Sequence, residues 1–352
     1  MDRSPPRLLV ALRRRDSVAS TVDAFLPEVP WRFAAETEGA DLASVEALLV
    51  GSVERELGDF RAETTPKLAF VQRAYTGLDG FPFERFPESV RIAGNVGGFA
   101  PFVAEHAVAL ALAAARSLRT SDRMVAEGRL RPPPPAISLV GTTALILGYG
   151  AIGTEIARRL AGFGVRRVGL NRNGRMAPEL DAVYPAHRLE EALADADVVF
   201  DVRPLTRATR ASIGADQLAR MRLTAIYVNV GRAGTVDEAA LFQHLSAHPT
   251  FRVALDVWWD EDYQAGTLGQ RFPWTHLPNF VGTPHSAGAV PGAEEYSLRM
   301  AVENVRRFFA GETPRYLADR RDYVEPTGAP GSPVAPAGGT PASPSGPAAR
   351  WR

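Results

Sequence analysis

The second half of the sequence holds three side chains that together could perform acid–base chemistry on a carboxylate substrate. Arg232 follows the apolar run 224–230, Glu261 follows the run 251–257, and His285 lies in the segment TPHSAG. A guanidinium binds a carboxylate through two parallel N–H groups. A carboxylate beside an imidazole fixes the tautomer of the ring and favours its protonated form. We therefore expect Arg232 to bind the substrate, Glu261 to orient His285, and His285 to donate a proton.

A glycine-rich turn of the dinucleotide-binding type lies at residues 148–153, with the sequence GYGAIG. It follows an apolar run and opens a helical pattern, which is the context that makes this motif informative. The first glycine allows a tight turn, the second lets a pyrophosphate approach the backbone, and the third lets helix and strand pack closely. The helix N-terminus also attracts phosphate. The predicted cofactor ligands here are Gly148, Tyr149, Gly150, Ala151, Ile152 and Gly153.

The residues at the end of the next strand indicate which dinucleotide binds. In enzymes that prefer NAD(H), an acid at this point accepts hydrogen bonds from the ribose 2′-hydroxyl. Here the position is Asn171, and the residues that follow are Arg172, Asn173, Gly174 and Arg175. Arginine is a natural partner of a phosphate dianion, although arginines that only face solvent would give the same sequence. We expect Asn171 and Arg172 to bind NADP(H), with NAD(H) as the alternative.

The elements that could position these residues alternate along the chain. Apolar runs that fit buried parallel strands lie at 7–12, 47–51, 68–72, 143–148, 166–171, 197–202, 224–230 and 251–257, with helical patterns between them and at 291–310. This order predicts an α/β protein with a doubly wound parallel sheet in its second half. Ligands of such sheets bind beyond the carboxyl ends of the strands, so Arg232, Asp256 and His285 could face one crevice.

Two further stretches bear on the organisation of the chain. A long helix rich in alanine and leucine is expected from Pro101 to about Glu127, and the prolines at 132–135 indicate a stiff connector after it. We expect the last helix to return to the first part of the chain. From about residue 325 the sequence is rich in proline, alanine, glycine and serine, which predicts a disordered tail.

The composition excludes several classes of protein and site. The chain has 352 residues, with 40 Lys plus Arg, 40 Asp plus Glu and no cysteine. This charge balance gives no indication of nucleic acid or an anionic membrane as a partner. Without cysteine there are no disulfides and no thiolate chemistry, and we expect no metal site. The apolar start is too short for a signal peptide, and no apolar helix reaches the length of a membrane span, so a cytoplasmic protein is expected.

Four motifs make the sequence resemble the D-isomer-specific 2-hydroxyacid dehydrogenase family, over nearly all of residues 45–312. They are the glycine-rich turn at 148–153, NVGRAGTVDEAAL at 229–241, DVWWDE at 256–261 and TPH at 283–285. Their order and spacing match the family, in particular its glyoxylate and hydroxypyruvate reductases. The resemblance implies a doubly wound parallel Rossmann sheet with a second, flavodoxin-like α/β substrate domain. The expected domains are a substrate-binding domain at 1–100 completed by 286–324, a dinucleotide-binding domain at 101–285, and the tail at 325–352.

The resemblance also implies a role for each matching residue. Arg232 would bind the carboxylate and keto oxygen of a 2-oxo acid, His285 would be the general acid/base, and Glu261 its partner. Asp256 would bind the carboxamide of the nicotinamide. The remaining expected contacts are those of Thr76, Gly77 and Asn95 with the substrate and those of Pro204, Thr206 and Val230 with the cofactor. A homodimer that closes a cleft between its domains is also implied.

Some positions depart from the common family pattern and leave alternatives open. Ala233 replaces the usual glycine after Arg232, and Trp258, Trp259 and Ser286 weakly resemble the formate dehydrogenase branch. The tryptophans could line the pocket or fill the core. A phosphite or formate dehydrogenase therefore remains an alternative, as does a nucleotide-sensing protein related to corepressors. The other histidines are interpreted as helix, loop or surface residues; they are His106, His187, His244, His248 and His276.

Overall fold

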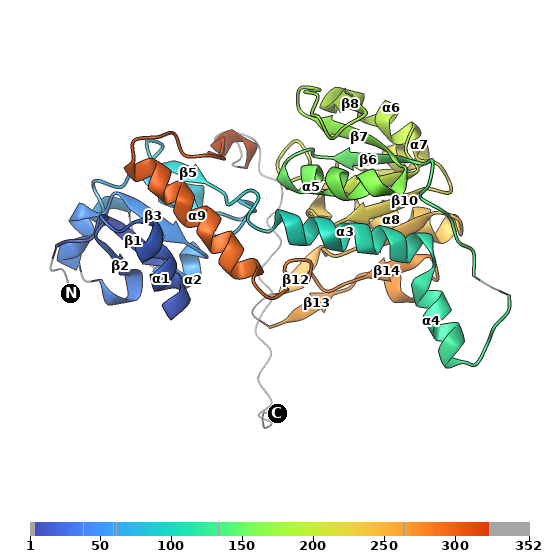
Figure 1. The fold of residues 1–352 in the computed structure, drawn as a ribbon, viewed down its shortest axis with the longest axis horizontal. Helices are drawn as coiled ribbons and strands as arrows, with labels where there is room; N and C mark the ends of the chain where they lie inside the picture. Colours follow the sequence, from blue (N-terminus) through green and yellow to red (C-terminus); the bar gives the residue numbers. More distant parts are fainter. Residues whose placement is uncertain are drawn as a thin grey trace.

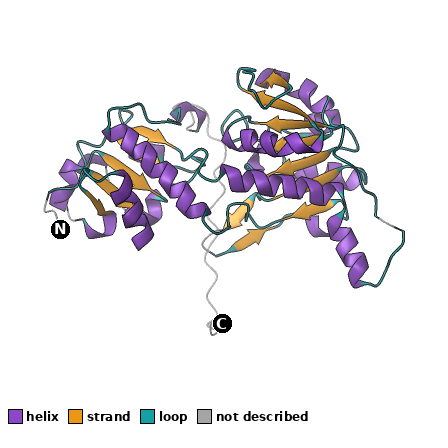
Figure 2. Cartoon of the chain, in the orientation of Figure 1, coloured by secondary structure: helices purple, strands orange, loops and turns teal. Residues whose placement is uncertain are grey.

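The computed structural model of this chain contains two parallel β-sheets, each covered by helices (Figure 1). The structure describes residues 4–323 apart from residues 38, 59, 61, 133, 263 and 264. The expected tail at 325–352 lies outside the described residues. In Figure 2 the strands of each sheet lie between helices, as the alternating apolar runs predict.

The first sheet has five parallel strands in the order β2-β1-β3-β4-β5. This is the flavodoxin-like order, which the family resemblance implied. The strands are β1 (Leu8–Ala11), β2 (Trp31–Phe33), β3 (Ala47–Val50), β4 (Phe70–Arg73) and β5 (Arg91–Ala93), and the helices α1 (Asp16–Phe25) and α2 (Val53–Leu57) connect them. The central strands β1 and β3 are buried along their whole length because helices and loops cover both faces.

The helix α9 (Ala293–Phe309) packs on this first sheet, although it comes near the end of the described chain (Figure 1). Its buried residues Leu298, Ala301, Val302 and Val305 share one hydrophobic cluster with strands β1, β3 and β4 and with α1. The expected division of the chain into a substrate-binding and a dinucleotide-binding domain stays a prediction.

The second sheet has seven parallel strands in the order β14-β11-β10-β9-β6-β7-β8. Its strands are β6 (Thr143–Leu147), β7 (Arg166–Asn171), β8 (Ala182–Pro185), β9 (Val198–Asp201), β10 (Ile226–Asn229), β11 (Arg252–Leu255) and β14 (Phe280–Gly282). The chain runs outward from β6 to one edge and then from β9 to the other, which confirms the predicted doubly wound Rossmann sheet.

Helices cover both faces of this second sheet. One face packs against α3 (Ala100–Ala115) and α5 (Ala151–Leu160). The other packs against α6 (Leu189–Ala194), α7 (Ala215–Arg220) and α8 (Glu238–Ala247). Beyond β11 a short hairpin forms from β12 (Asp260–Asp262) and β13 (Thr267–Gly269).

The predicted single helix at 101–127 is wrong, because the chain forms two helices there. The helix α3 ends at Ala115 and α4 spans Leu118–Ala126, with a bend of 61° between them. Ser117 adopts a left-handed conformation with φ 48°, which no α-helix can contain. The carbonyl of Ala115 accepts a hydrogen bond from the backbone N–H of Ile137 in the connector that follows α4. This bond replaces the one that a further turn of α3 would supply.

No single helix among the described residues has the length and apolar composition that a membrane crossing requires. The bent pair of α3 and α4 meets these criteria only when its two helices are counted together, and half of the residues of α3 are buried in the core beneath the second sheet.

Candidate active site

Three of the predicted functional residues follow neighbouring strands of the second sheet. In the register of the sheet, Asn229 of β10 lies opposite Leu255 of β11, and Leu255 lies opposite Gly282 of β14. Parallel strands lie about 4.8 Å apart, so their carboxyl ends form one short edge. Arg232, Asp256 and His285 come within three residues of these ends and therefore belong to the same edge of the sheet.

Glu261 and His285 form the pair that the sequence predicts. Nδ1 of His285 lies 2.9 Å from each carboxylate oxygen of Glu261. Because a carboxylate only accepts hydrogen bonds, Nδ1 must carry a proton and is committed to Glu261. Glu261 is itself held by the backbone N–H of Trp258, at 2.7 Å. The carboxylate therefore fixes the tautomer and orientation of the ring.

Asp256 holds the backbone that carries His285. Its side chain is buried and accepts hydrogen bonds from the backbone of Ser286 at 2.8 Å and of Ala287 at 3.0 Å. His285 has a left-handed backbone with φ 51°, which is unfavourable for a residue with a side chain. The hydrogen bonds from the amides of Ser286 and Ala287 to Asp256 offset this conformational cost. Asp256 thus positions the histidine, whether or not it also contacts a cofactor.

His106 is a helix residue, on α3, as the sequence interpretation allowed, but that interpretation missed its contact with this arrangement. Its Nε2 lies 2.9 Å from Oγ1 of Thr283, and Thr283 donates to Asp256 at 2.6 Å. Burial alone would raise the pKa of Asp256, but the hydrogen bonds from His106, Thr283 and the two amides outweigh it and lower that pKa. Asp256 therefore carries a stable buried charge.

Arg232 reaches from the second sheet to a loop of the first. Its Nε donates to both carboxylate oxygens of Asp79, at 3.1 and 3.0 Å. Its Nη2 lies directly over Gly77, where a Cβ atom would overlap it. The backbone amides of Thr76 and Gly77 donate no hydrogen bond within the described part of the chain. A guanidinium nitrogen of Arg232 therefore lies against the backbone of Gly77, beside the carboxylate of Asp79. Asp79 could not be predicted as a partner of Arg232, because only folding brings the two side chains together.

A buried polar network lies between Arg232 and the glycine-rich turn. Asp201 and Arg203 form an ion pair with distances of 2.6 and 2.9 Å, and both side chains are almost inaccessible to solvent. Asp201 also accepts hydrogen bonds from Tyr227 and Thr235, while Thr235 bonds to the carbonyl of Arg232. Burial raises the pKa of Tyr227 well above its usual value, so the phenol remains a donor. The network fixes the turn that carries Arg232.

The glycine-rich turn has the geometry that a dinucleotide needs. Gly148 has φ 86°, and a Cβ there would lie 2.7 Å from Cγ of Arg203. Gly153 lies close to Ile146, so the helix α5 packs tightly on its strand. At Gly150 a Cβ would meet only one carbonyl oxygen, at 3.9 Å, which leaves open space before the helix. The first N–H groups of α5 have no partner within the helix and suit a phosphate.

The loop after β7 contains the residues that were expected to choose the dinucleotide. Asn171 uses its side chain to hold this loop, through hydrogen bonds to the backbone of Arg175. Arg172 is exposed and donates to Asp322 at 2.9 Å. The absence of an acid in the local sequence therefore does not mean that no acid lies near this loop.

The other predicted site residues occupy varied positions. Asn95 is buried, and its side-chain amide donates to Ala74 and Ser297, which joins β4 to α9. Thr206 is buried in the loop after β9 and Pro204 is exposed there. Val230 belongs to the core. The phenol of Tyr149 donates to Glu179.

The tryptophans belong to the core, which answers a question that the sequence left open. Trp274 is inaccessible and Trp258 is 8% exposed, in a cluster on one face of the second sheet. Trp259 stacks on Trp274 with ring centres 5.8 Å apart and donates to the carbonyl of Val236. These tryptophans pack in the core and support the loops that they contact.

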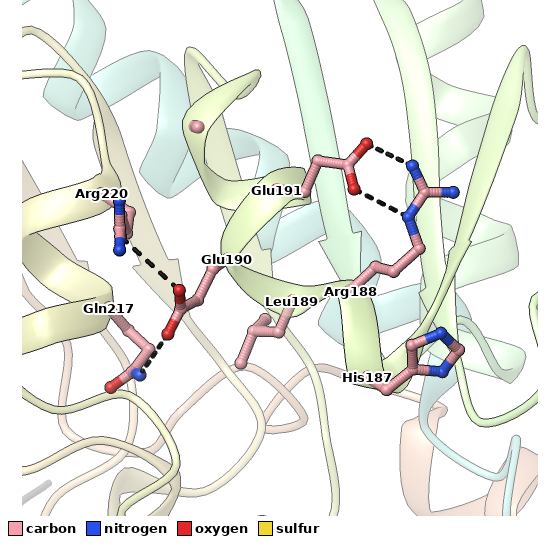
Figure 3. Close-up of a pocket in the computed structure, with 8 residues that line it drawn as sticks. His187, Arg188, Leu189, Glu190, Glu191, Gln217 and Arg220 are labelled. Atoms are coloured by element: carbon pink, nitrogen blue, oxygen red, sulfur yellow. Dashed lines mark hydrogen bonds and ion pairs between the residues drawn. The ribbon is translucent and has the colours of Figure 1, made fainter.

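A surface pocket of about 550 Å³ lies elsewhere, between α6 and α7 (Figure 3). Its charged side chains are mostly paired with one another: Arg188 with Glu191, and Arg220 and Gln217 with Glu190. His187 also lines it. None of the residues in this pocket belongs to the predicted site, and the described residues contain no group of three His, Asp or Glu side chains that could hold a metal ion.

Comparison with known proteins agrees with this geometry. A family model described as D-isomer specific 2-hydroxyacid dehydrogenase, NAD binding domain, matches residues 108–287. A glyoxylate reductase from Korarchaeum cryptofilum is 31% identical over 288 residues, which cover 80% of this chain and 83% of that protein.

Two solved structures extend the comparison to the whole fold. A protein from Pyrobaculum aerophilum with the provisional name formate dehydrogenase is 30% identical, with a TM-score of 0.77 over 90% of this chain and all of that one. A D-isomer specific 2-hydroxyacid dehydrogenase from Xanthobacter autotrophicus, solved with NADPH and MES, is 25% identical, with a TM-score of 0.75 over 91% of this chain and all of that one.

Proposed function

The chain belongs to the D-isomer-specific 2-hydroxyacid dehydrogenase family and is an oxidoreductase, and from this premise we propose that it reduces 2-oxo acids to (R)-2-hydroxy acids with NADPH. The observation that carries the proposal is the guanidinium of Arg232 over Gly77, on the same sheet edge as the His285–Glu261 pair. An anion site beside a proton donor is what reduction of a 2-oxo acid requires.

Arg232 binds the substrate in this proposal. Its Nη2 and the amides of Thr76 and Gly77 hold the carboxylate, while the guanidinium also stabilises charge that develops on the keto oxygen. Asp79 fixes the orientation of the guanidinium through both of its carboxylate oxygens. Pre-orientation of this kind lowers the cost of assembling the reactive geometry.

His285 supplies the proton. Its Nδ1 is committed to Glu261, so Nε2 transfers the proton to the keto oxygen and takes it back in the oxidative direction. When bound, the dihydronicotinamide supplies the hydride that the carbonyl carbon receives. One hydride and one proton convert the carbonyl to a hydroxyl group, so atoms and electrons balance.

The residues that would hold the cofactor are those of the glycine-rich turn and the loops beside it. Gly148–Gly153 leave room for the pyrophosphate, and Pro204, Thr206 and Val230 lie in or next to loops at the same sheet edge. Asp256 would accept a hydrogen bond from the carboxamide N–H through Oδ2, which also accepts from the backbone of Ala287. Arg172 and Arg175, with no acid in their loop, favour NADPH, and the Xanthobacter relative was solved with NADPH.

A homodimer is also part of the proposal. Four apolar side chains between α4 and the start of the second sheet are strongly exposed, at 52 to 84%: Leu118, Val125, Leu130 and Val140. Exposed apolar groups in one region favour a protein interface. Light scattering of the purified protein tests this directly, and a monomer at micromolar concentration would contradict it.

Oxidation of formate is the second candidate function, because a relative that is 30% identical bears that provisional name. Phosphite oxidation, which the sequence left open, uses the same scaffold. The carboxylate of Glu261 beside His285 favours the 2-oxo acid reaction. An initial-rate screen of glyoxylate, hydroxypyruvate and bulkier 2-oxo acids with NADPH and NADH, and of formate and phosphite with both oxidised cofactors, decides between them. Turnover of formate or phosphite alone would refute the proposal.

A further inference from the structure

The last described segment of the chain, residues 319–323, joins loops of both sheets. Arg320 donates to four backbone carbonyls of the loop before β5, at 2.6 to 3.3 Å. Tyr323 stacks on Phe83 of the same loop, with ring centres 5.5 Å apart. These contacts fix the segment to the first sheet, and in Figure 1 the red end of the described chain lies between the two lobes.

Asp322 extends from this segment to the second sheet. Its carbonyl accepts a hydrogen bond from the backbone N–H of Arg207, at 2.9 Å. Its carboxylate accepts from Nη2 of Arg172, also at 2.9 Å. Arg207 follows β9 and Arg172 follows β7, so two of the loops that are expected to contact the cofactor meet at the same residue.

The position of the carboxylate has a direct consequence for a phosphate group. A 2′-phosphate that binds Arg172 must displace Asp322 or lie beside it, and two anions close together repel one another. The unphosphorylated ribose carries no such charge. An acid near the ribose is also the feature by which related folds favour NAD(H). In this chain that acid would come from the far end of the sequence, 150 residues from Arg172.

We propose that Asp322 is a specificity-determining residue that disfavours the 2′-phosphorylated dinucleotide by occupying the guanidinium of Arg172. The inference rests on the proposed function, which places Arg172 at the ribose. It adds that Asp322 weakens the preference for NADPH that Arg172 alone would give. The hydrogen bond that Arg172 donates to Asp322 raises the pKa of Arg172, in keeping with a favourable charge pair.

The anchors of the segment explain why Asp322 would persist as a competitor. Exposed ion pairs between long side chains contribute little stability because the side chains lose freedom when they pair. Here the acid is held by the contacts of Arg320 and Tyr323 with the first sheet, so the carboxylate stays near Arg172 without support from the pair itself.

The test measures cofactor binding to the full chain, without substrate, by titration of tryptophan fluorescence with NADPH and NADH. Asp322→Asn removes the charge and keeps the size of the side chain. We expect it to lower the ratio of the NADPH to the NADH dissociation constant by at least about threefold, the effect of one exposed ion pair. Asp195→Asn removes an equal charge from the end of α6, where Asp195 pairs with Arg166, and should leave the ratio unchanged.

Arg172→Ala separates failure of this inference from failure of the proposed function. In the Arg172→Ala background, Asp322→Asn should have a smaller effect on the ratio, because no guanidinium remains to be released and only the repulsion between carboxylate and phosphate is relieved. If Asp322→Asn leaves the ratio unchanged while Arg172→Ala weakens NADPH binding, the role of Asp322 is refuted and the proposed function stands. If Arg172→Ala does not weaken NADPH binding relative to NADH, the proposed cofactor preference itself is refuted.

Discussion

His285 and Glu261 are joined by two contacts of 2.9 Å, from one ring nitrogen to both oxygens of the carboxylate. The two residues come from different elements, since Glu261 lies on β12 and His285 follows β14. This symmetric arrangement leaves a single ring nitrogen able to exchange a proton with a substrate. It also commits the carboxylate to orientation rather than to proton transfer.

His285→Ala should therefore lower kcat for 2-oxo acid reduction by about a thousandfold, the usual size of a general acid contribution. Glu261→Gln should lower kcat by a smaller factor, because the ring remains but loses its fixed tautomer. Cofactor binding, measured by fluorescence titration, should be unchanged in both variants. The control is His276→Ala, which alters an exposed histidine of the same chain. Near-normal turnover by His285→Ala would refute the assigned role.

Gly77→Ala should weaken substrate binding without unfolding the protein. The added methyl group would overlap Nη2 of Arg232 and approach Oδ1 of Asp79 at 2.6 Å, and both are ends of side chains that can move. We expect KM for the 2-oxo acid to rise by about tenfold or more, a loss of about 1.4 kcal/mol of binding, with Tm almost unchanged. Gly162→Ala is the matched control, because a Cβ there would meet no atom within 4 Å. Equal KM values in the two variants would place Arg232 outside the substrate site.

Replacing the buried network by apolar side chains should separate stability from activity. In the variant Asp201→Leu, Arg203→Leu, Tyr227→Phe, no buried charge is left without a partner, so Tm should stay near that of the parent or rise. Arg203→Leu alone leaves Asp201 unpaired and should cost about 3–5 kcal/mol in the free energy of unfolding.

The triple variant should nevertheless lose about tenfold in kcat/KM, because Thr235 and the turn of Arg232 lose their contact with Asp201. Urea unfolding and initial rates on the same preparations check both statements. A triple variant with the parent activity would show that the network serves only the fold.

Stability should fall in mild acid because of His244. Its ring packs edge-to-face against Phe251, and its Nε2 is buried without a hydrogen-bond partner among the described residues. Burial, and then the charge of His248, lower the pKa of His244 from 6.5 to about 4. The unfolded chain therefore binds this proton more readily, and the free energy of unfolding decreases as the pH falls from 6.5 towards 4.

Urea unfolding at a series of pH values measures this decrease. His244→Leu should flatten the dependence between pH 4 and 6.5, whereas His276→Leu should leave it as in the parent. An identical slope in the parent and in His244→Leu would mean that other groups dominate the response to acid.

The sequence could predict the features that depend on neighbours along the chain. The glycine-rich turn is one example, because a positive φ at Gly148 and close packing at Gly153 are local demands. The sequence did not predict four separate strands, because these are the edge strands of the two sheets and are only partly buried, so they lack a continuous apolar run; they are β2, β5, β8 and β14. The break at Ser117 was missed because no glycine or proline marks it.

Contacts between distant segments could not be predicted. Asp79 is 153 residues from Arg232, and Asp322 is 150 residues from Arg172. His106 lies in an ordinary helical pattern, and only the packing of α3 beneath the sheet brings it to Thr283 and thus to Asp256. In each case the side chain is unremarkable in its own segment and gains its role from the partner that folding supplies.

The late position of α9 determines when the first sheet can mature during translation. The strands β1, β3 and β4 leave the ribosome early, but the helix that covers one of their faces ends at Phe309. Domains usually fold as their sequence emerges, at about 5–20 residues per second. For this chain, α9 reaches the amino-terminal strands only after some 200 further residues have been synthesised, the distance along the chain from β5 to α9. The intervening Rossmann sheet can close first, so the order of maturation is the reverse of the order of synthesis.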